Sequence, residues 1–218
     1  MRAAMPLVNL TSSLCPPFHR RFRIVCQFIA FLLFVGGGMV AATPEIITSL
    51  IDPVKLDSLT GDRAANGRMR KIAYWLESNR KEGHDPATVI SIAQRNLGYE
   101  GTERAKADKA SLLRNLVILE RLGCLTESGM DALRRGKAPT ITQGPYAGDI
   151  VHVDHIIPRA IAPGLDEKIY NLEFMPGGLN MGKGARIGQR QIALAKQWLA
   201  VDLISAEEYR SVMIEFGG

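Results

Sequence analysis

The sequence predicts an α+β protein that is mostly α-helical. Apolar residues recur at three- and four-residue spacing through most of residues 44–137 and again after residue 187, which is typical of helices with one buried face. Between these stretches lie two short apolar segments with the length of strands, followed by a helical segment. We therefore expect a helical N-terminal region, then a small strand–strand–helix unit with further helices packed on it.

The first 42 residues have the pattern of an export signal. His19–Arg23 is basic, Ile24–Val35 is apolar, and small residues end the segment at Ala42. This order predicts a signal peptide cleaved after Ala42, and hence an exported protein, periplasmic or secreted. Two alternatives stay open. Residues 24–42 approach the ~20 residues of a membrane-spanning helix and could form an uncleaved anchor, and translation from Met39 would give a cytoplasmic protein.

The predicted leader also holds most of the basic excess. The formal net charge is +5, but residues 1–42 contain four arginines and no acidic residue. Removing those four leaves 23 basic against 22 acidic side chains, so any basic surface on the remaining chain must be local. Cys15 and Cys26 also lie in the leader, which leaves Cys124 alone. We therefore expect neither an intrachain disulfide nor a zinc site built on cysteine pairs.

Local start and stop signals divide residues 43–137 into helices. The expected segments are one through Met69–Leu76 that ends at Gly83, one from Asp85-Pro86 to before Gly98, one from about Thr102 to Gly123, and one from Thr126 to Gly136. The dense apolar run Leu112–Leu122 predicts that the third is the central buried helix of this region. Nothing in residues 43–137 indicates a role.

A loop rich in glycine and proline follows at residues 136–149, and we place the start of a second domain, residues 138–218, inside it. Near its end, Ile192 and Trp198 belong to an amphipathic helix. Ser205 and Glu208 have the spacing of a capping box that opens a last helix.

The segment 148–186 contains more polar residues within its apolar stretches than a buried core needs. Its sequence is GDIVHVDHIIPRAIAPGLDEKIYNLEFMPGGLNMGKGAR. The first apolar segment ends in Asp154 and His155, the second opens with Asn171, and Asn180 begins the helix that follows. That helical segment carries Lys183 and Arg186.

The ordered pieces Val153-Asp154-His155-Ile156-Ile157-Pro158, Asn171-Leu172 and Leu179-Asn180-x-x-Lys183-Gly184-x-Arg186 resemble the motif of HNH (ββα-metal, His-Me finger) endonucleases. The resemblance covers about residues 148–186, a minority of the chain. It implies a small ββα-metal module in residues 138–218 and a metal-dependent nuclease that hydrolyses phosphodiester bonds in nucleic acid, with DNA favoured and RNA as an alternative.

The resemblance also assigns roles. His155 would be the general base, since a neutral imidazole can accept the proton of a water molecule near neutral pH. Asn171 would orient His155 by hydrogen bonds to the backbone, and Asp154 and Asn180 would bind the metal ion. One carboxylate and one amide oxygen favour Mg²⁺, or Mn²⁺, over zinc. Gly184 stands where some family members have a further histidine, which points the same way.

Four further residues are candidates beside this set. His152 shares a strand face with Asp154 and could be an auxiliary ligand. Lys183, Arg186 and Arg159 are expected to contact phosphates. The basic Arg134–Lys137 stretch could extend the same groove or be a solvated helix end. No element for reading bases is evident, so low sequence specificity is expected.

Each of these residues also has a structural interpretation. Asp154 and His155 could be a surface pair, Asn180 a helix N-cap, and Lys183 with Arg186 a solvated helix face. The main alternative for the whole protein is a catalytically inactive HNH-derived module that binds nucleic acid or protein.

Overall fold

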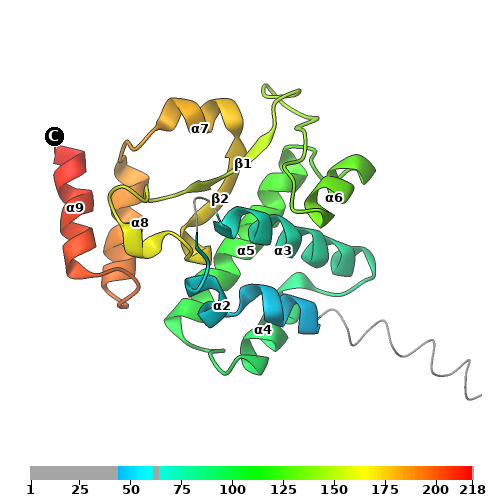
Figure 1. Cartoon of the computed structure of the whole chain (residues 1–218), viewed down its shortest axis with the longest axis horizontal. Helices are drawn as coiled ribbons and strands as arrows, with labels where there is room; N and C mark the ends of the chain where they lie inside the picture. The colour runs from blue at the N-terminus through cyan, green and yellow to red at the C-terminus, as the bar shows by residue number, and fades with distance from the viewer. Residues whose placement is uncertain (1–43, 61–63, 218) are drawn as a thin grey trace, which may run out of the picture. The chain divides into compact units, whose positions relative to one another are not determined.

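The computed structural model describes residues 44–60 and 64–217, so the predicted signal peptide lies outside the described residues. Residues 44–51 are helical. The elements that follow are α2 (Pro53–Asp57), α3 (Ala64–Lys81), α4 (Pro86–Asn96), α5 (Glu103–Arg121), α6 (Glu127–Arg134), β1 (Val151–His155), η1 (Pro163–Leu165), η2 (Ile169–Asn171), β2 (Leu172–Pro176), α7 (Gly177–Lys183), α8 (Gln189–Leu199) and α9 (Ala206–Gly217) (Figure 1). The predicted mostly helical α+β class is confirmed. Within the described ranges, none of the helices combines the length and apolar character needed to cross a bilayer.

The predicted helix starts are made by the expected side chains. Asp85 caps α4 by accepting hydrogen bonds from the backbone N–H groups of Ala87 and Thr88. Thr102 and Thr126 cap α5 and α6 in the same way. At α9, Ser205 and Glu208 bond to each other's backbone N–H, so the predicted capping box is present.

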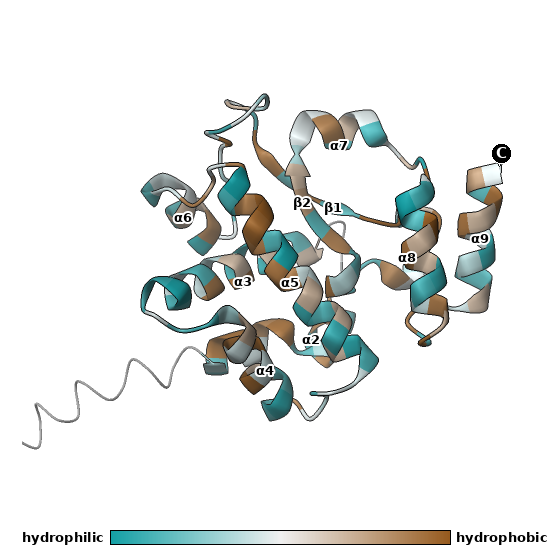
Figure 2. Cartoon of the chain, turned by 180° about the vertical axis from the view of Figure 1, so that it is seen from behind, coloured by the Kyte–Doolittle hydropathy of each residue, from teal (hydrophilic) through white to brown (hydrophobic). Residues whose placement is uncertain are grey.

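Helix α5 is the central buried helix, as predicted. It contacts α3, α4, η2 and β2, and Leu112, Leu116 and Leu119 are buried along it. Figure 2 colours much of α5 as apolar, in line with this position.

The sheet has two antiparallel strands. His155 lies opposite Leu172, and Asp154 lies opposite Glu173. Helices α5 and α7 both contact the sheet, which Figure 1 shows between them. The predicted strand–strand–helix order is therefore present, with two differences in position. Asn171 is the last residue of η2 and directly precedes β2, and Asn180 lies in the middle of α7 rather than at its start.

The N-terminal helices and the sheet share one core. Residues 44–60 and 64–217 belong to a single compact unit, and one buried apolar cluster extends from Ile47 to Phe174. A second cluster joins the segment after β1 to α8 and α9 through Ile157, Trp198 and Val212. The domain boundary near residue 138 stays a prediction, and the stretches on its two sides share the first cluster.

The outer edge of β2 is paired with a side chain of α5. Asn115 Nδ2 donates to the Leu172 carbonyl at 3.0 Å, and Asn115 Oδ1 accepts from the Phe174 N–H at 2.7 Å. The hydroxyl of Ser111 lies 2.9 and 3.1 Å from the carbonyls of Ile169 and Leu172. Asn115 is 2% exposed, so these backbone groups have no access to water as a substitute partner.

Replacing Asn115 is expected to destabilise the fold. Asn115→Ala removes the hydrogen-bond partner of the buried Phe174 N–H and one of the two partners of the Leu172 carbonyl. This loss should lower the free energy of unfolding by about 2–4 kcal/mol. Urea denaturation measures this change. The control is Asn96→Ala, because Asn96 is exposed on α4 and should change stability by less than about 0.5 kcal/mol. Equal effects of the two substitutions would contradict the proposed importance of this edge.

Candidate functional site

The candidate site lies where α7 packs on β1. His152 and Asp154 are two residues apart and share one face of the strand, and Asn180 and Lys183 are three apart and share one face of the helix. Asn180 Nδ2 lies 3.2 Å from His152 Nδ1, and Lys183 Nζ lies 2.5 Å from Asp154 Oδ2. The structure therefore brings together both predicted metal ligands, the auxiliary histidine and one predicted phosphate contact.

His155 is held by an aspartate that the sequence did not single out. Its Nε2 lies 2.8 Å from Asp166 Oδ1 and 2.9 Å from the Asp166 backbone carbonyl. Both partners are acceptors, so they favour the tautomer in which Nε2 carries the hydrogen. A neutral imidazole in this tautomer has its free lone pair on Nδ1. Asp166 thus orients the ring and leaves Nδ1 able to accept a proton.

Asn171 fixes the chain that leaves His155. Its side chain is fully buried, accepts from the Ile157 N–H at 2.8 Å, and donates to the carbonyls of Ile157 and Leu165 at 3.0 and 3.2 Å. Its own backbone carbonyl accepts from the Ile156 N–H. One amide therefore ties the turn after β1 to the loop that carries Asp166, which are the two segments that place the His155 ring.

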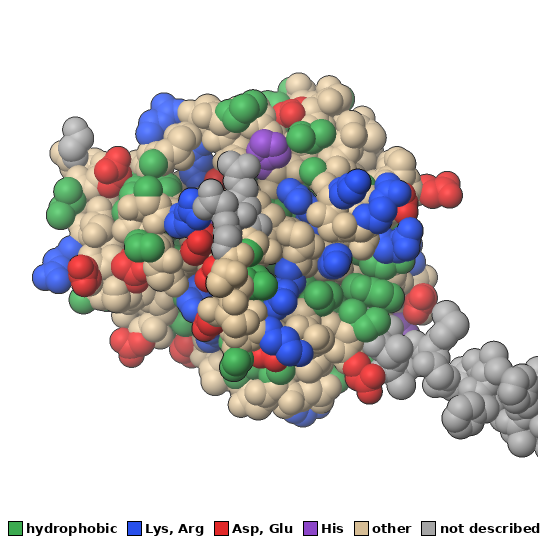
Figure 3. Space-filling model, viewed as in Figure 1, with side chains coloured by type: hydrophobic (Ala, Val, Ile, Leu, Met, Phe, Trp, Pro, Cys, Tyr) green, Lys and Arg blue, Asp and Glu red, His purple; other side chains and the backbone are tan. Residues whose placement is uncertain are grey.

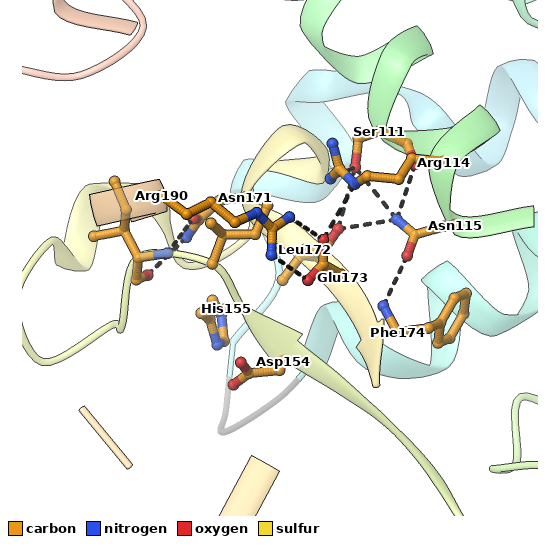
Figure 4. A network of polar contacts seen from close by, with 12 residues as sticks. Ser111, Arg114, Asn115, Asp154, His155, Asn171, Leu172, Glu173, Phe174 and Arg190 are labelled. Carbon is orange, nitrogen blue, oxygen red and sulfur yellow. Dashed lines mark hydrogen bonds and ion pairs between the residues drawn. The ribbon is translucent and has the colours of Figure 1, made fainter. Parts of the chain in front are cut away.

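The site has two carboxylates on facing strand positions. Asp154 and Glu173 are directly opposite across the sheet, where like charges repel. Lys183 offsets the charge of Asp154, and two arginines offset the charge of Glu173 (Figure 4). Arg190 forms a bidentate pair with Glu173, with one bond of 2.8 Å between Nη1 and Oε1. Arg114 Nε lies 3.2 Å from Glu173 Oε2, close enough for an ion pair.

The pKa of Glu173 reports the balance of these contributions. Burial alone would raise the pKa of this carboxyl, but the hydrogen bonds and charges of Arg190, with the charge of Arg114, outweigh burial and hold its pKa below the usual value. Glu173 therefore stays ionised beside Asp154. Its partners Arg114 of α5 and Arg190 of α8 connect the sheet to both helices.

The predicted phosphate contacts all have partners within the protein. Lys183 Nζ also donates to the His155 carbonyl at 2.6 Å. Arg186 is exposed and donates to the carbonyls of Gly182 and Lys183 at the end of α7. Arg159 Nη1 lies 3.7 Å from Asp166 Oδ2. These cations surround the site, but each would have to exchange a protein partner for a phosphate oxygen.

The donor set at Asp154 suits a hard divalent cation. A carboxylate and an amide oxygen are the oxygen donors that Mg²⁺ and Mn²⁺ prefer, with water completing the shell. The Lys183 ammonium places a positive charge against Asp154 Oδ2, one helical turn from Asn180. Over the described ranges, no group of three or more His, Cys, Asp or Glu side chains is placed to hold a metal ion.

Comparison of the chain with models of protein families, with curated proteins and with solved structures finds no match. The function is therefore inferred from the residues and contacts of this chain.

Removal of the Glu173 charge is expected to reduce stability in a pH-dependent way. Because the folded state lowers this pKa, the contribution of Glu173 is fully present above the unfolded value near ~4.3 and is lost as the pH falls through the folded value. Glu173→Gln should therefore cost about 2 kcal/mol at pH 7 and progressively less below about pH 4.

Urea denaturation of both proteins at pH 7, 5 and 3.5 measures the difference. Glu127→Gln is the matched control, because Glu127 is exposed on α6 and should have an effect below about 0.5 kcal/mol. A cost for Glu173→Gln that is constant from pH 7 to 3.5 would show that the charge of Glu173 is not the cause.

Proposed function

We propose that this chain is a metal-dependent endonuclease of the HNH type that hydrolyses phosphodiester bonds in DNA. The observation that carries the proposal is that β1 and α7 face each other through two contacts, His152 with Asn180 and Asp154 with Lys183, next to a histidine whose Nε2 is engaged by Asp166. A nuclease needs an activated water molecule and a cation beside the phosphate, and this arrangement contains residues for both.

His155 is the general base in this proposal. With Nε2 donating to Asp166, Nδ1 accepts the proton of the attacking water. Asp166 stabilises the imidazolium that results, because its carboxylate stays beside the ring. Asn171 acts as a positioning residue, since it ties together the two segments that hold His155 and Asp166.

Asp154 and Asn180 would hold the divalent cation, Mg²⁺ or Mn²⁺, with His152 as an auxiliary ligand. When bound, the ion supplies Lewis-acid stabilisation of the charge on the phosphate and on the leaving 3′ oxygen. Arg186 and Arg159 lie exposed at the border of the site and supply positive charge to the flanking phosphates. If the predicted signal peptide is used, cleavage takes place outside the cytoplasm.

Purified protein should nick or linearise plasmid DNA in the presence of Mg²⁺ or Mn²⁺, and this cleavage should stop when EDTA is added. His155→Ala removes the general base and should lower the cleavage rate by ~10²–10⁴-fold. Gel electrophoresis of a time course measures the rate, and the same assay with RNA tests the other substrate.

His84→Ala is the matched control, because His84 lies between α3 and α4 and is not part of the site. It should cleave at the rate of the unchanged protein. Absence of cleavage with every divalent metal ion, or full activity of His155→Ala, would refute the proposed function.

The contact between Lys183 and Asp154 favours a second candidate, a nucleic-acid-binding module without catalysis. Here the ammonium permanently neutralises the carboxylate and no metal ion enters. This candidate predicts DNA binding that persists in EDTA together with no turnover, whereas the nuclease requires Lys183 to leave Asp154 when the metal ion binds.

Lys183→Met separates these cases. If Lys183 competes with the metal ion, the substitution should lower the Mg²⁺ concentration for half-maximal cleavage several-fold, because the ion no longer displaces a charge-assisted bond. If Lys183 serves only to bind phosphate, the KM for DNA rises and the Mg²⁺ requirement is unchanged. Lys196→Met, on the exposed side of α8, is the control and should alter neither quantity.

A further inference from the structure

A cavity of about 280 Å³ adjoins the candidate site on the side of α3. His152 and Asn180 form the wall that it shares with the site, and Asn66 and Arg70 of α3 form the opposite wall. The cavity is slightly smaller than the ~300–1,000 Å³ of typical small-molecule sites. It therefore has room for one unit of a polymer whose remainder lies outside.

The α3 wall carries polar groups that lack partners. Asn66 is 8% exposed, and its Oδ1 is buried with no hydrogen-bond partner in the described part of the chain. Arg70 Nε is buried and equally without a partner, although Arg70 Nη1 donates to the Gly136 carbonyl at 3.2 Å. Unsatisfied buried polar groups cost free energy, so their presence around a cavity indicates groups that a ligand completes.

Within the described part of the chain, the charge of Arg70 is not balanced by an acidic side chain. No carboxylate of residues 44–60 and 64–217 forms an ion pair with Arg70, in contrast to Arg80, Arg104 and Arg190. Within the same residues Arg68, Arg121, Arg186 and Arg210 also have no ion pair, but of these five arginines it is Arg70 that lines the cavity. Burial lowers the pKa of Arg70, which is the expected sign for a cation that lacks a counter-ion. An anion from outside the protein would supply one.

Basic side chains continue outward from this wall. Figure 3 shows Lys and Arg side chains gathered over α3 and α6 on the face in view. Lys71 is exposed next to Arg70. Gly136 has a φ of +70° and packs closely against α3, where a side chain added at this glycine would lie 3.3 Å from Lys71 Cε. Arg134 and Arg135 share the single carboxylate of Asp131 and leave a net positive charge there. The cavity thus lies between the candidate catalytic residues and a basic surface.

We propose that this cavity binds the nucleotide next to the phosphate that is cleaved. Arg70 pairs with the phosphate of that nucleotide, and the Asn66 amide oxygen accepts a hydrogen bond from an N–H of its base. The proposal rests on the proposed function for the identity of the neighbouring site, and it gives α3 a part in binding the substrate. A nucleotide suits both walls, because it offers an anion to the unpaired guanidinium and a donor to the unpaired oxygen.

The experiment measures binding of a fluorescein-labelled dT₁₂ oligonucleotide by anisotropy, in EDTA, with the full-length His155→Ala protein. Kd is measured at several salt concentrations for the parent and with Arg70→Gln, Arg70→Lys, Asn66→Ala or Arg210→Gln added. Loss of one phosphate contact on a single strand lowers the slope of log Kd against log salt by about 0.7. Arg70→Gln should show that decrease, and Arg70→Lys should keep the slope because it keeps the charge.

Asn66→Ala should weaken binding of dT₁₂ a few-fold with an unchanged salt slope. The same substitution should have no effect on a 12-residue abasic oligonucleotide, which has the phosphates and lacks the bases. Arg210 is exposed on α9, away from the cavity, and Arg210→Gln should change neither affinity nor slope. A merely structural role of Arg70 or Asn66 would weaken both oligonucleotides alike and leave the salt slope unchanged, which would overturn the proposal.

The outcomes separate the two proposals. Plasmid cleavage by the unchanged protein, together with no effect of Arg70→Gln and Asn66→Ala on binding, refutes the nucleotide cavity and keeps the nuclease. The expected slope and base dependence without plasmid cleavage refute the nuclease and support the cavity as a binding site. Absence of any binding to the oligonucleotide refutes the nucleotide cavity, and the plasmid assay alone then decides the nuclease.

Discussion

The structure around the candidate site depends on the hydrogen bonds between Asn115 and the outer edge of β2. A two-stranded antiparallel ribbon is at best marginally stable alone, because each strand has an unpaired edge and little apolar area to bury. Asn115 presents a carbonyl and an amide in the positions that a third strand would supply. Since this residue lies in the middle of α5, the strand opposite Asp154 and His155 is fixed to the central helix of the N-terminal region.

This dependence gives residues 43–137 a physical role that their sequence did not reveal. The helices build the core on which the sheet rests, and α5 also supplies Arg114 to the Glu173 network. A functional site needs its side chains held to within about 0.5 Å. If the two-stranded sheet could shift on the helices, Asp154 would move relative to α7. Helix α3 lies against the same region through its contacts with α6 and the loop after it.

The sequence predicted the features that depend on local spacing. Asp85-Pro86 and Thr102 start helices because a cap acts within one turn, and the pairs His152–Asp154 and Asn180–Lys183 follow from the periods of a strand and a helix. It did not predict Asp166, because a loop position gives no sign of which ring it will contact. The middle position of Asn180 was also missed, since α7 starts after Pro176 with two glycines, and its Gly178 N–H is capped by Asp149 from before β1.

The two candidate functions differ in what neutralises Asp154. The register places this carboxylate opposite Glu173, whose charge is already matched by two arginines, so Asp154 needs its own cation in either case. The Lys183 ammonium is held closely, because its side chain is only 18% exposed and it also donates to the carbonyls of His155 and Ile156. A divalent ion that displaces it has to compensate for these bonds as well as for the bond to Asp154. Under the nuclease proposal this lysine moves away from Asp154 when a divalent ion binds, whereas under the binding-module proposal the pair is permanent. Asn180, one turn before Lys183 on the same face of α7, contacts His152, so in both cases α7 is joined to β1 at two points.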